Sequence, residues 1–419
     1  MKKVCIFFAA NRYWPKRERL ESVYNEIRES LPGFDEYKLI TDSDELILPD
    51  GDIIAAVPLS GAVQKRILDS CEKYRCAILY GAYIRGNACD AACDDMMRAN
   101  AAPTFMDVWA VLKRSRNTAM IALSVSDLSE KIAAASAYCE INGANVLLIG
   151  HTEPWVVSTP RENERFSKLL SVNMLHAEQD ELAQLYYDTK KEDAEPYYRH
   201  FTSLASGIKE PSDEDIWNAC KMAHALVTLL KKYDAKTAAI ACFDLLKVGT
   251  SACLGVSFVN DMTDMSIACE GDLDSAITML IMKNLTCGKL FMANPALRLD
   301  GTVNFSHCTA PICCCGENSP CILRSHHESG IGVSPQIDIP IGQRITACRL
   351  SGVEGIFTVH GGMTVKGAYE PVCRTQINVK FDDFDHYLET SLGCHQVFAF
   401  ENIESKAKTI ANLLGLKTL

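Results

Sequence analysis

The chain has 419 residues, of which 48% are apolar and 23% charged, and this composition is typical of a soluble globular protein with two or three domains. The net charge of −11, with no basic stripe along the sequence, argues against a nucleic-acid partner and against binding to anionic membranes. No apolar stretch approaches the roughly 20 residues that a membrane-spanning helix needs. The N-terminal apolar run 4–10 is too short for a signal peptide and is followed by charged residues, so we expect a cytoplasmic protein.

The 19 cysteines are many for a chain of this kind. Several stand in apolar segments, as in "KVCIFF" around Cys5, "AIACFD" around Cys242 and "SIACEG" around Cys269. In such segments a cysteine behaves as a small buried apolar residue. A secreted disulfide scaffold would be a short, loop-rich chain. We therefore expect reduced thiols in a reducing cytosol.

The first half alternates short apolar runs with segments of helical periodicity. The expected strands are 2–10, 52–59, 76–83, 118–124 and 144–151. The expected helices between them are 17–31, 63–74 and 127–143, the last ending at Gly143, a residue suited to a helix C-terminus. Strands separated by helices of this length predict parallel β-α-β units. The first two thirds of the chain therefore predict an α/β fold with two doubly wound, Rossmann-like lobes.

The character of the sequence changes near residue 294. Before it, polar helices are expected over about 162–232, followed by buried strands at 237–244 and 265–271 and a helix at 272–285. After it, short alternating segments separated by Gly and Pro predict an antiparallel β domain resembling a small barrel, closed by a helix at 404–416. The expected domains are therefore 1–140, 141–293 and 294–419.

The sequence lacks the common nucleotide and hydrolase motifs. It contains no GxGxxG, no Walker A loop, no GxSxG and no HExxH. The two Rossmann-like lobes therefore come without a phosphate-binding fingerprint, and we expect neither NAD nor ATP as a ligand.

Polar side chains at strand ends are the candidates for a site. The apolar strand at 265–269 runs into Glu270, at the carboxyl edge where ligands of parallel sheets bind. A carboxylate there needs a partner or a cation, whereas Asp272 is suited to cap the following helix. The next strand ends at Asn294, and His307 and His395 follow in the β domain. Either histidine alone suits an ordinary polar role, but a carboxylate, an amide and two imidazoles together would suit a divalent metal such as Mn²⁺.

Three stretches between residues 265 and 419 carry a family resemblance: "IACEGDLDSAITMLIMKNLTCGKLFMANP", "NFSHCTAP" with "LRSHHESGIGVSPQIDIPIGQRIT", and "GCHQVF". They resemble segments of the L-fucose/L-arabinose isomerase superfamily. The resemblance implies two α/β lobes and a C-terminal β-barrel domain, in agreement with the periodicity. It also implies a small sugar as substrate and a homo-oligomer, a trimer or hexamer.

The resemblance assigns roles residue by residue. Glu270 would be a metal ligand and the catalytic acid/base, and His395 the ligand supplied by the C-terminal domain. His307 resembles the additional histidine ligand of the arabinose isomerase branch. The second catalytic carboxylate of the family falls at Asn294, whose amide oxygen can bind a hard cation but cannot take a proton.

Together these features predict a metal-dependent aldose–ketose isomerase acting on an open-chain sugar through a cis-enediol, with Mn²⁺ as the cofactor. Arg324, His326 and Glu328 in "LRSHHESG" could contact the substrate or form a solvated turn, and the resemblance favours the substrate. Without a carboxylate at position 294, either Glu270 works as a single base, with water or the metal handling the hydroxyl proton, or another acid takes the second role, for which Asp300 and Glu328 are the candidates. The alternative is a relative of the same fold that binds a sugar or sugar acid without isomerising it.

The stretch 304–321, "NFSHCTAPICCCGENSPC", contains one histidine and five cysteines. Its three consecutive cysteines, 313–315, cannot all face one centre without distorting the backbone, and the CxxC spacing of zinc knots is missing. A thiolate site that also uses Cys308 and Cys321 stays open. We interpret the stretch as a loop that leads away from His307.

Overall fold

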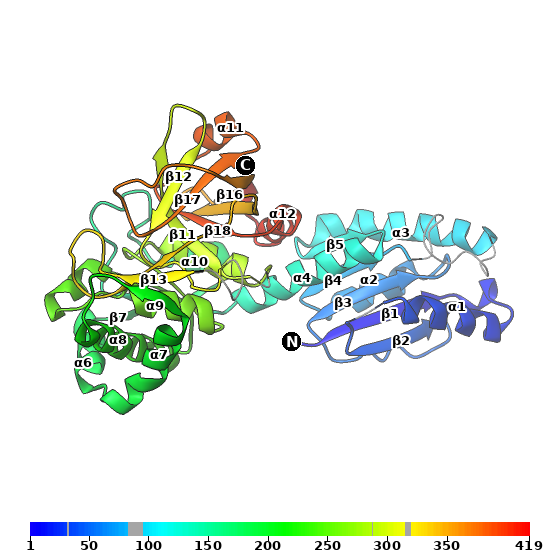
Figure 1. Ribbon diagram of the computed structural model, residues 1–419. Helices are drawn as coiled ribbons and strands as arrows, with labels where there is room; N and C mark the ends of the chain where they lie inside the picture. The colour runs from blue at the N-terminus through cyan, green and yellow to red at the C-terminus, as the bar shows by residue number, and fades with distance from the viewer. Residues whose placement is uncertain (32, 83–94, 287, 315–319) are drawn as a thin grey trace. The chain divides into compact units, whose positions relative to one another are not determined.

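The computed structural model describes residues 1–419 except 32, 83–94, 287 and 315–319. It shows two parallel sheets with helices, of five and four strands, and a C-terminal antiparallel barrel of six strands (Figure 1). The predicted fold class is therefore confirmed. The chain forms two compact units, Met1–Glu140 with Asn412–Gly415, and Ile141–Ala411 with Leu416–Leu419.

The first unit contains a five-stranded parallel sheet in the order β2-β1-β3-β4-β5. Its strands are β1 (Lys3–Ala9), β2 (Glu36–Thr41), β3 (Ile53–Pro58), β4 (Cys76–Tyr80) and β5 (Ala119–Ala122). Its helices are α1 (Arg17–Glu29), α2 (Gln64–Cys71), α3 (Asp95–Ser115) and α4 (Val125–Ile141), with the 3-10 turn η1 (Asn11–Tyr13). The central strands β1, β3 and β4 are buried along their length except at Lys3, as continuous apolar runs covered by helices on both faces should be. Residue 83, the end of one expected strand, lies outside the described residues.

The second unit begins with a four-stranded parallel sheet in the order β10-β9-β6-β7. Its strands are β6 (Asn145–Ile149), β7 (Asn173–Ala177), β9 (Ala235–Ile240) and β10 (Ser266–Ala268). The helices between them are α5 (Glu164–Leu170), α6 (Gln179–Asp188), α7 (Lys191–Leu204), α8 (Asp213–Lys232) and α9 (Cys253–Met262), with the 3-10 helix η2 (Cys242–Val248). Helix α8 begins at a capping box formed by Ser212 and Asp215.

The barrel follows the sheet in the same unit. Its strands are β11 (Leu290–Leu297), β12 (Val303–His307), β15 (Arg344–Ser351), β16 (Ile356–Val365), β17 (Thr375–Phe381) and β18 (Gln396–Ala399). They run in the order β15-β18-β11-β12-β17-β16, and pairing of β15 with β16 closes the ring. Side chains such as Phe291, Phe305 and Phe398 form a buried core. Two helices, α11 (Phe384–Glu389) and α12 (Glu404–Leu413), and the short strand β19 (Lys417–Thr418) complete the domain (Figure 1).

A small three-stranded sheet, β14-β13-β8, was not expected from the sequence. Strand β8 (Ala205–Ile208) follows α7, β13 (Cys321–Arg324) begins at the last cysteine of the cysteine-rich stretch, and β14 (Ser334–Ile337) comes after it. Strand β13 pairs with β8 in parallel and with β14 antiparallel. This sheet therefore joins the helical part of the second unit to the segment that contains Arg324.

Helix α10 (Leu273–Lys283) links the parallel sheet to the barrel, because it packs against β9 and β10 and also against β15 and β18. Its residues from Leu273 to Met282 are all buried. A helix enclosed on all sides should be mostly apolar, as this one is, and its buried side chains Asp274, Ser275 and Thr278 take part in hydrogen bonds. No helix in the described part of the chain has both the length and the apolar character needed to span a membrane.

Candidate metal centre

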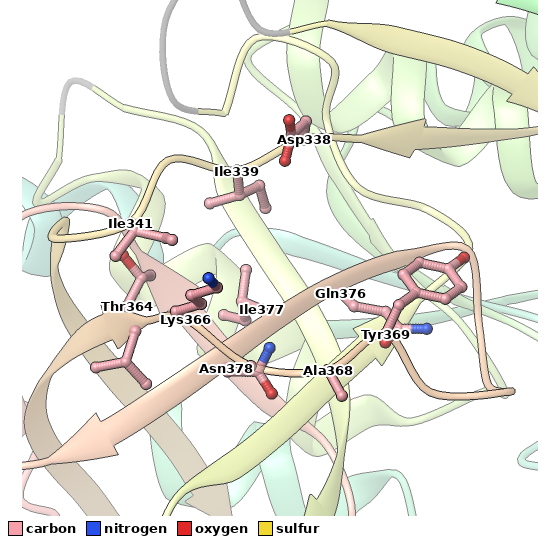
Figure 2. Close-up of a pocket in the computed structure, with 12 residues that line it drawn as sticks. Asp338, Ile339, Ile341, Thr364, Lys366, Ala368, Tyr369, Gln376, Ile377 and Asn378 are labelled. Atoms are coloured by element: carbon pink, nitrogen blue, oxygen red, sulfur yellow. The ribbon is translucent and has the colours of Figure 1, made fainter.

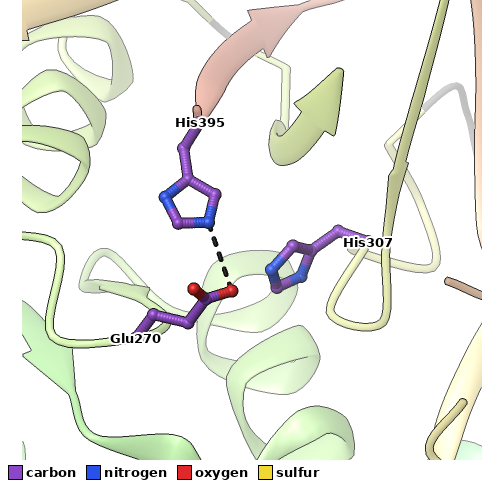
Figure 3. A group of neighbouring side chains, drawn as sticks. All are labelled: Glu270, His307 and His395. Carbon is purple, nitrogen blue, oxygen red and sulfur yellow. Dashed lines mark hydrogen bonds and ion pairs between the residues drawn. The ribbon is translucent and has the colours of Figure 1, made fainter. Parts of the chain in front are cut away.

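Three side chains predicted as metal ligands come together in the second unit. Glu270 follows β10, His307 ends β12 and His395 directly precedes β18 (Figure 3). One ligand atom from each lies within 4.8 Å of the others. His395 Nε2 is 3.3 Å from Glu270 Oε1, and the two imidazole rings are 6.0 Å apart. A carboxylate and two imidazoles at this spacing suit a divalent transition metal such as Mn²⁺ or Zn²⁺.

The backbone at Glu270 is strained. Its φ is +59° and that of Gly271 is +61°, so two successive left-handed residues turn the chain from β10 into α10. A Cβ at position 271 would lie 2.1 Å from the carbonyl oxygen of His151, so only glycine fits there. A non-glycine residue in this conformation costs about 1–2 kcal/mol. Such strain gathers at functional positions, and here it aims the Glu270 carboxylate at the two histidines.

The Glu270 carboxylate is held from both sides. Its Oε1 faces His395, and its Oε2 accepts a 2.7 Å hydrogen bond from the indole Nε1 of Trp155. Burial alone would raise the pKa of Glu270, but His395, His307 and Trp155 lower it to about 2. Glu270 is therefore an anionic ligand at neutral pH.

His395 is oriented by Asp272. Its Nδ1–H donates to Asp272 Oδ2 at 2.7 Å, and both side chains are buried. Burial opposes protonation, but the hydrogen bonds to Asp272 and Glu270 raise the pKa of His395 well above its usual value. A carboxylate on the far nitrogen fixes the ring and leaves Nε2 for a metal. A divalent ion and the Nε2 proton therefore compete for the same nitrogen.

His307 differs in charge from His395. Burial and the nearby His395 lower the pKa of His307 to about 4, so its imidazole is neutral at physiological pH. Its Nδ1 is hydrogen-bonded to the Thr309 hydroxyl at 2.7 Å, which leaves Nε2 for a ligand. A divalent ion would thus meet an anionic Glu270 and a neutral His307. His395 would release its Nε2 proton when the ion binds.

The sequence identified Asp272 as a helix cap, and the structure adds a second role. Asp272 caps α10 by accepting from the backbone N–H of Ser275 at 3.1 Å. Its other oxygen holds His395 and also accepts from the fully buried Arg349. Thr159 donates to the capping oxygen, Oδ1, at 2.7 Å. Arg349, Thr159 and Trp155 were missed because they lie far from Asp272 and Glu270 in the sequence.

Asn294 lies between the two strands that carry the histidines. It pairs across to Ser306, the residue before His307, and its neighbour Ala293 pairs with Gln396, the residue after His395. If the β11–β18 pairing is extended by one residue, Asn294 lies opposite His395. No hydrogen bond joins the Asn294 side chain to the three ligands among the described contacts. Its role as a fourth ligand remains a prediction, supported by its position.

The predicted substrate residues lie in and after β13. Arg324 forms a forked ion pair with Glu210, with N–O distances down to 2.5 Å, and its Nη1 donates to Gln336. It would have to exchange these partners to hold a substrate. Glu328 is exposed in a turn, and Asp300 binds Thr302 at the tip of the β11–β12 hairpin. Neither is brought to the metal ligands by a described contact.

His326 is connected to the ligand group through aromatic rings. Its ring meets Phe243 edge-on at 5.8 Å, Phe243 meets Trp155 edge-on at 5.2 Å, and Trp155 binds Glu270. Its Nδ1 is hydrogen-bonded to Ser329 at 2.9 Å. Burial lowers the pKa of His326, so the imidazole is neutral. Of the three predicted substrate residues, His326 has the position that fits best.

The cysteines of the stretch 304–321 belong to no metal group among the residues that the structure describes. There, only Glu270, His307 and His395 meet as three or more potential ligands within ligand distance. Cys313, Cys314 and Cys321 are described and belong to no such group, whereas Cys315 lies outside the described residues. The group of potential metal ligands found in the described residues thus consists of one carboxylate and two imidazoles.

A separate pocket of about 180 Å³ lies on the barrel (Figure 2). Its polar lining includes Asp338, Thr364, Lys366, Gln376 and Asn378. Ligand pockets usually measure about 300–1,000 Å³. This pocket is smaller and shares no lining residue with the metal group, so we do not assign the function to it.

Comparison with known proteins found neither a protein-family model nor a curated protein that matches the chain. The function is therefore inferred from the geometry above and from the sequence resemblance.

Proposed function

We propose that the chain is a metal-dependent aldose–ketose isomerase that acts on an open-chain sugar. The observation that carries this proposal is the convergence of Glu270, His307 and His395 within 4.8 Å. The buried Asp272 behind His395 supports it, because such a partner is typical of metal-binding histidines. The ligand types favour Mn²⁺. The homo-oligomeric state implied by the resemblance is part of the same proposal.

The metal ion and the side chains around it would have different roles in the reaction. A divalent ion bound to them would polarise the oxygens at C1 and C2 of the sugar. Glu270 would take the proton from C2 and deliver a proton to C1 through a cis-enediol, while the hydroxyl proton moves from O2 to O1. Trp155 holds one carboxylate oxygen of Glu270 in place, so the other stays directed into the group. His326, behind the aromatic rings of Phe243 and Trp155, would help to position the sugar.

A second candidate function is metal-dependent sugar binding without isomerisation. Two observations favour it. The pKa of Glu270 is lowered to about 2, which makes the carboxylate a good ligand but a weak base. The second acid position holds Asn294, which cannot carry a proton.

Proton exchange separates the two functions. The purified protein with Mn²⁺ would be incubated in D₂O with a panel of aldoses, and NMR would follow the appearance of a ketose and of deuterium at its C1. The isomerase predicts both signals, and both should vanish with a chelator. Metal-dependent sugar binding with neither signal would establish the second function. Absence of any metal binding would overturn both.

A further inference from the structure

The outer face of the barrel carries polar side chains at the pocket of about 180 Å³ (Figure 2). Along β17, Ile377 and Val379 belong to the buried core, so Gln376 and Asn378, which alternate with them, point to the other face of the strand. Both amides line the pocket. None of the lining residues is a metal ligand, so a ligand could bind here without the metal centre.

A third amide lies beside these two. In the antiparallel pairing of β12 with β17, Asn304 is directly opposite Asn378, so their side chains share a face. The Asn304 Nδ2 donates to Gln376 Oε1 at 3.3 Å and to Asn378 Oδ1 at 3.2 Å. Asn304 is fully buried, and its Oδ1 has no hydrogen-bond partner among the described residues. A buried acceptor without a partner destabilises a fold, which points to a role for these amides beyond packing.

The walls of the pocket are fixed by hydrogen bonds. Gln376 Oε1 accepts from the backbone N–H of Glu370 at 2.9 Å, and Gln376 Nε2 donates to the Glu370 carbonyl at 2.8 Å. The Thr364 hydroxyl donates to the carbonyl of Pro340 at 2.8 Å and accepts from the N–H of Gln343 at 2.9 Å. The pocket is therefore formed before a ligand arrives, and a preformed site loses less free energy in ordering when it binds.

Asn378 offers the pocket a hydrogen-bond donor. Its Oδ1 accepts from Asn304, whereas its Nδ2 donates to no residue that the structure describes. A Cβ at position 367 would lie 2.2 Å from Asn378 Cγ, so the backbone can lie against this amide only because residue 367 is glycine. The amide is thus held by its neighbours while its N–H₂ group stays available to a ligand.

The rest of the lining indicates an uncharged ligand. The two charged lining residues, Asp338 and Lys366, have opposite signs and are exposed, so water screens their charges. The less exposed polar groups are the neutral amides described above. Ile341 and Tyr369 add exposed apolar surface. A few polar groups on an apolar lining are typical of small-molecule sites.

The size and the polar groups of the pocket suit hydroxyl groups. A volume of about 180 Å³ equals that of about six water molecules at roughly 30 Å³ each. A hydroxyl group both donates and accepts hydrogen bonds. It can therefore accept from Asn378 Nδ2 and donate to the Asp338 carboxylate, as water does. A small ligand with several hydroxyl groups could replace these waters without leaving a polar group unpaired.

We propose that this pocket is a second binding site, for a small uncharged polyhydroxylated molecule, and that binding needs no metal. One ligand hydroxyl accepts from Asn378 Nδ2, another donates to Asp338, and the C–H groups of the ligand lie against Ile341 and Tyr369. The inference does not rest on the proposed function, because no residue of the pocket belongs to the metal group.

Calorimetric titration with xylitol, an uncharged pentitol, tests the proposal. The full chain would be titrated in excess EDTA, so that no metal ion is available to Glu270, His307 and His395. We expect binding to the wild type and about fivefold weaker binding to Asn378→Ala, which loses one hydrogen bond to the ligand. Asn173→Ala is the matched control, since Asn173 is also a hydrogen-bonded amide on a strand but lies in β7. Its affinity should equal that of the wild type.

A second variant fills the pocket without a change in the core. Ala368 is an exposed lining residue, so Ala368→Phe should fold normally and lose xylitol binding. The proposal is overturned if the wild type binds no xylitol in EDTA, or if both pocket variants bind it as the wild type does. Binding that appears only when Mn²⁺ replaces EDTA would place xylitol at the metal centre and also contradict it. Glycine is the charged probe, and binding of glycine in place of xylitol would show that the ligand class is wrong.

Discussion

Arg349 donates from Nη1 to Oδ2 of Asp272 at 2.9 Å, and neither side chain reaches solvent. The same guanidinium group donates to the carbonyl oxygen of His395 and to the hydroxyl of Ser158. One buried cation thus anchors the acid that orients His395 and the backbone of His395 itself. The pair serves the metal group by fixing a ligand, and it makes that part of the core sensitive to loss of charge.

Replacing Asp272 should test this link directly. Asp272→Asn leaves Arg349 buried without its closest anion, and breaking such a pair costs about 3–5 kcal/mol of unfolding free energy. It also removes the carboxylate partner of His395, so metal affinity should fall about 10–100-fold. Chemical denaturation and metal titration measure the two effects.

Asp274→Asn is the matched control. Asp274 is also buried near Arg349, but at 3.9 Å, and burial together with the Asp272 charge raises its pKa to about 7. An amide replaces this partly protonated carboxyl group with little loss, and its oxygen can still accept from the N–H of Gly352. We expect a cost of about 1 kcal/mol or less. Equal losses in the two variants would contradict the role given to Asp272.

Removing His395 should remove the metal. His395→Ala deletes one of three ligands, so the wild type should hold about one Mn²⁺ per chain and the variant much less. His360→Ala is the control, because His360 is a buried histidine of β16 that belongs to no ligand group in the described residues. Metal analysis after dialysis gives the answer. Unchanged stoichiometry in His395→Ala would show that the ligand assignment is wrong.

Adding a charge at Asn294 should tighten metal binding. Asn294→Asp places a carboxylate between the two histidine strands, and a further anionic oxygen strengthens the hold on Mn²⁺, by about tenfold. If Glu270 works as a single base, turnover should stay within about tenfold, or 1.4 kcal/mol in the barrier. Asn304→Asp, also in the barrel but paired with Gln376 and Asn378, should leave metal affinity unchanged. No tightening in Asn294→Asp would place that side chain outside the metal shell.

Glu210 should contribute to stability in a defined pH range. The forked bond from Arg324 lowers its pKa in the folded chain from 4.5 to about 2. A lowered carboxyl pKa stabilises the fold above about pH 4.5, and this stabilisation is lost as the pH falls toward 2. Glu210→Gln should therefore cost about 1 kcal/mol or less at pH 7, since the pair is partly exposed. Denaturation curves of both proteins should converge as the pH falls; a constant difference would contradict the ion pair.

The sequence predicted the elements with strong local signals. Continuous apolar runs identified β1, β3 and β4, and Glu270 was recognised because a carboxylate at the end of a buried strand needs a partner. Strand β2 was missed because "EYKLIT" is a half-buried edge strand with a mixed pattern. Strand β13 was missed because its four residues carry too short a pattern to read.

Long-range contacts are what local patterns cannot show. From the sequence, Asp272 is predicted only as a helix cap. His395, which is hydrogen-bonded to its carboxylate, lies 123 residues away in the chain. Arg349 stands in "TACRLSG", where an alternating strand would turn it toward solvent. Only closure of the barrel against α10 buries it beside Asp272.

The distances along the chain also set an order for folding. Glu270 and His395 are 125 residues apart, and His307 comes from a third strand. Each such closure carries an entropic cost before any contact is gained, so the ligands cannot meet until the ring of strands has closed on α10. In small zinc domains, by contrast, the ion itself drives folding. Here most of the buried contacts around the centre are made by the polypeptide, and we expect an ion to bind after these contacts have formed.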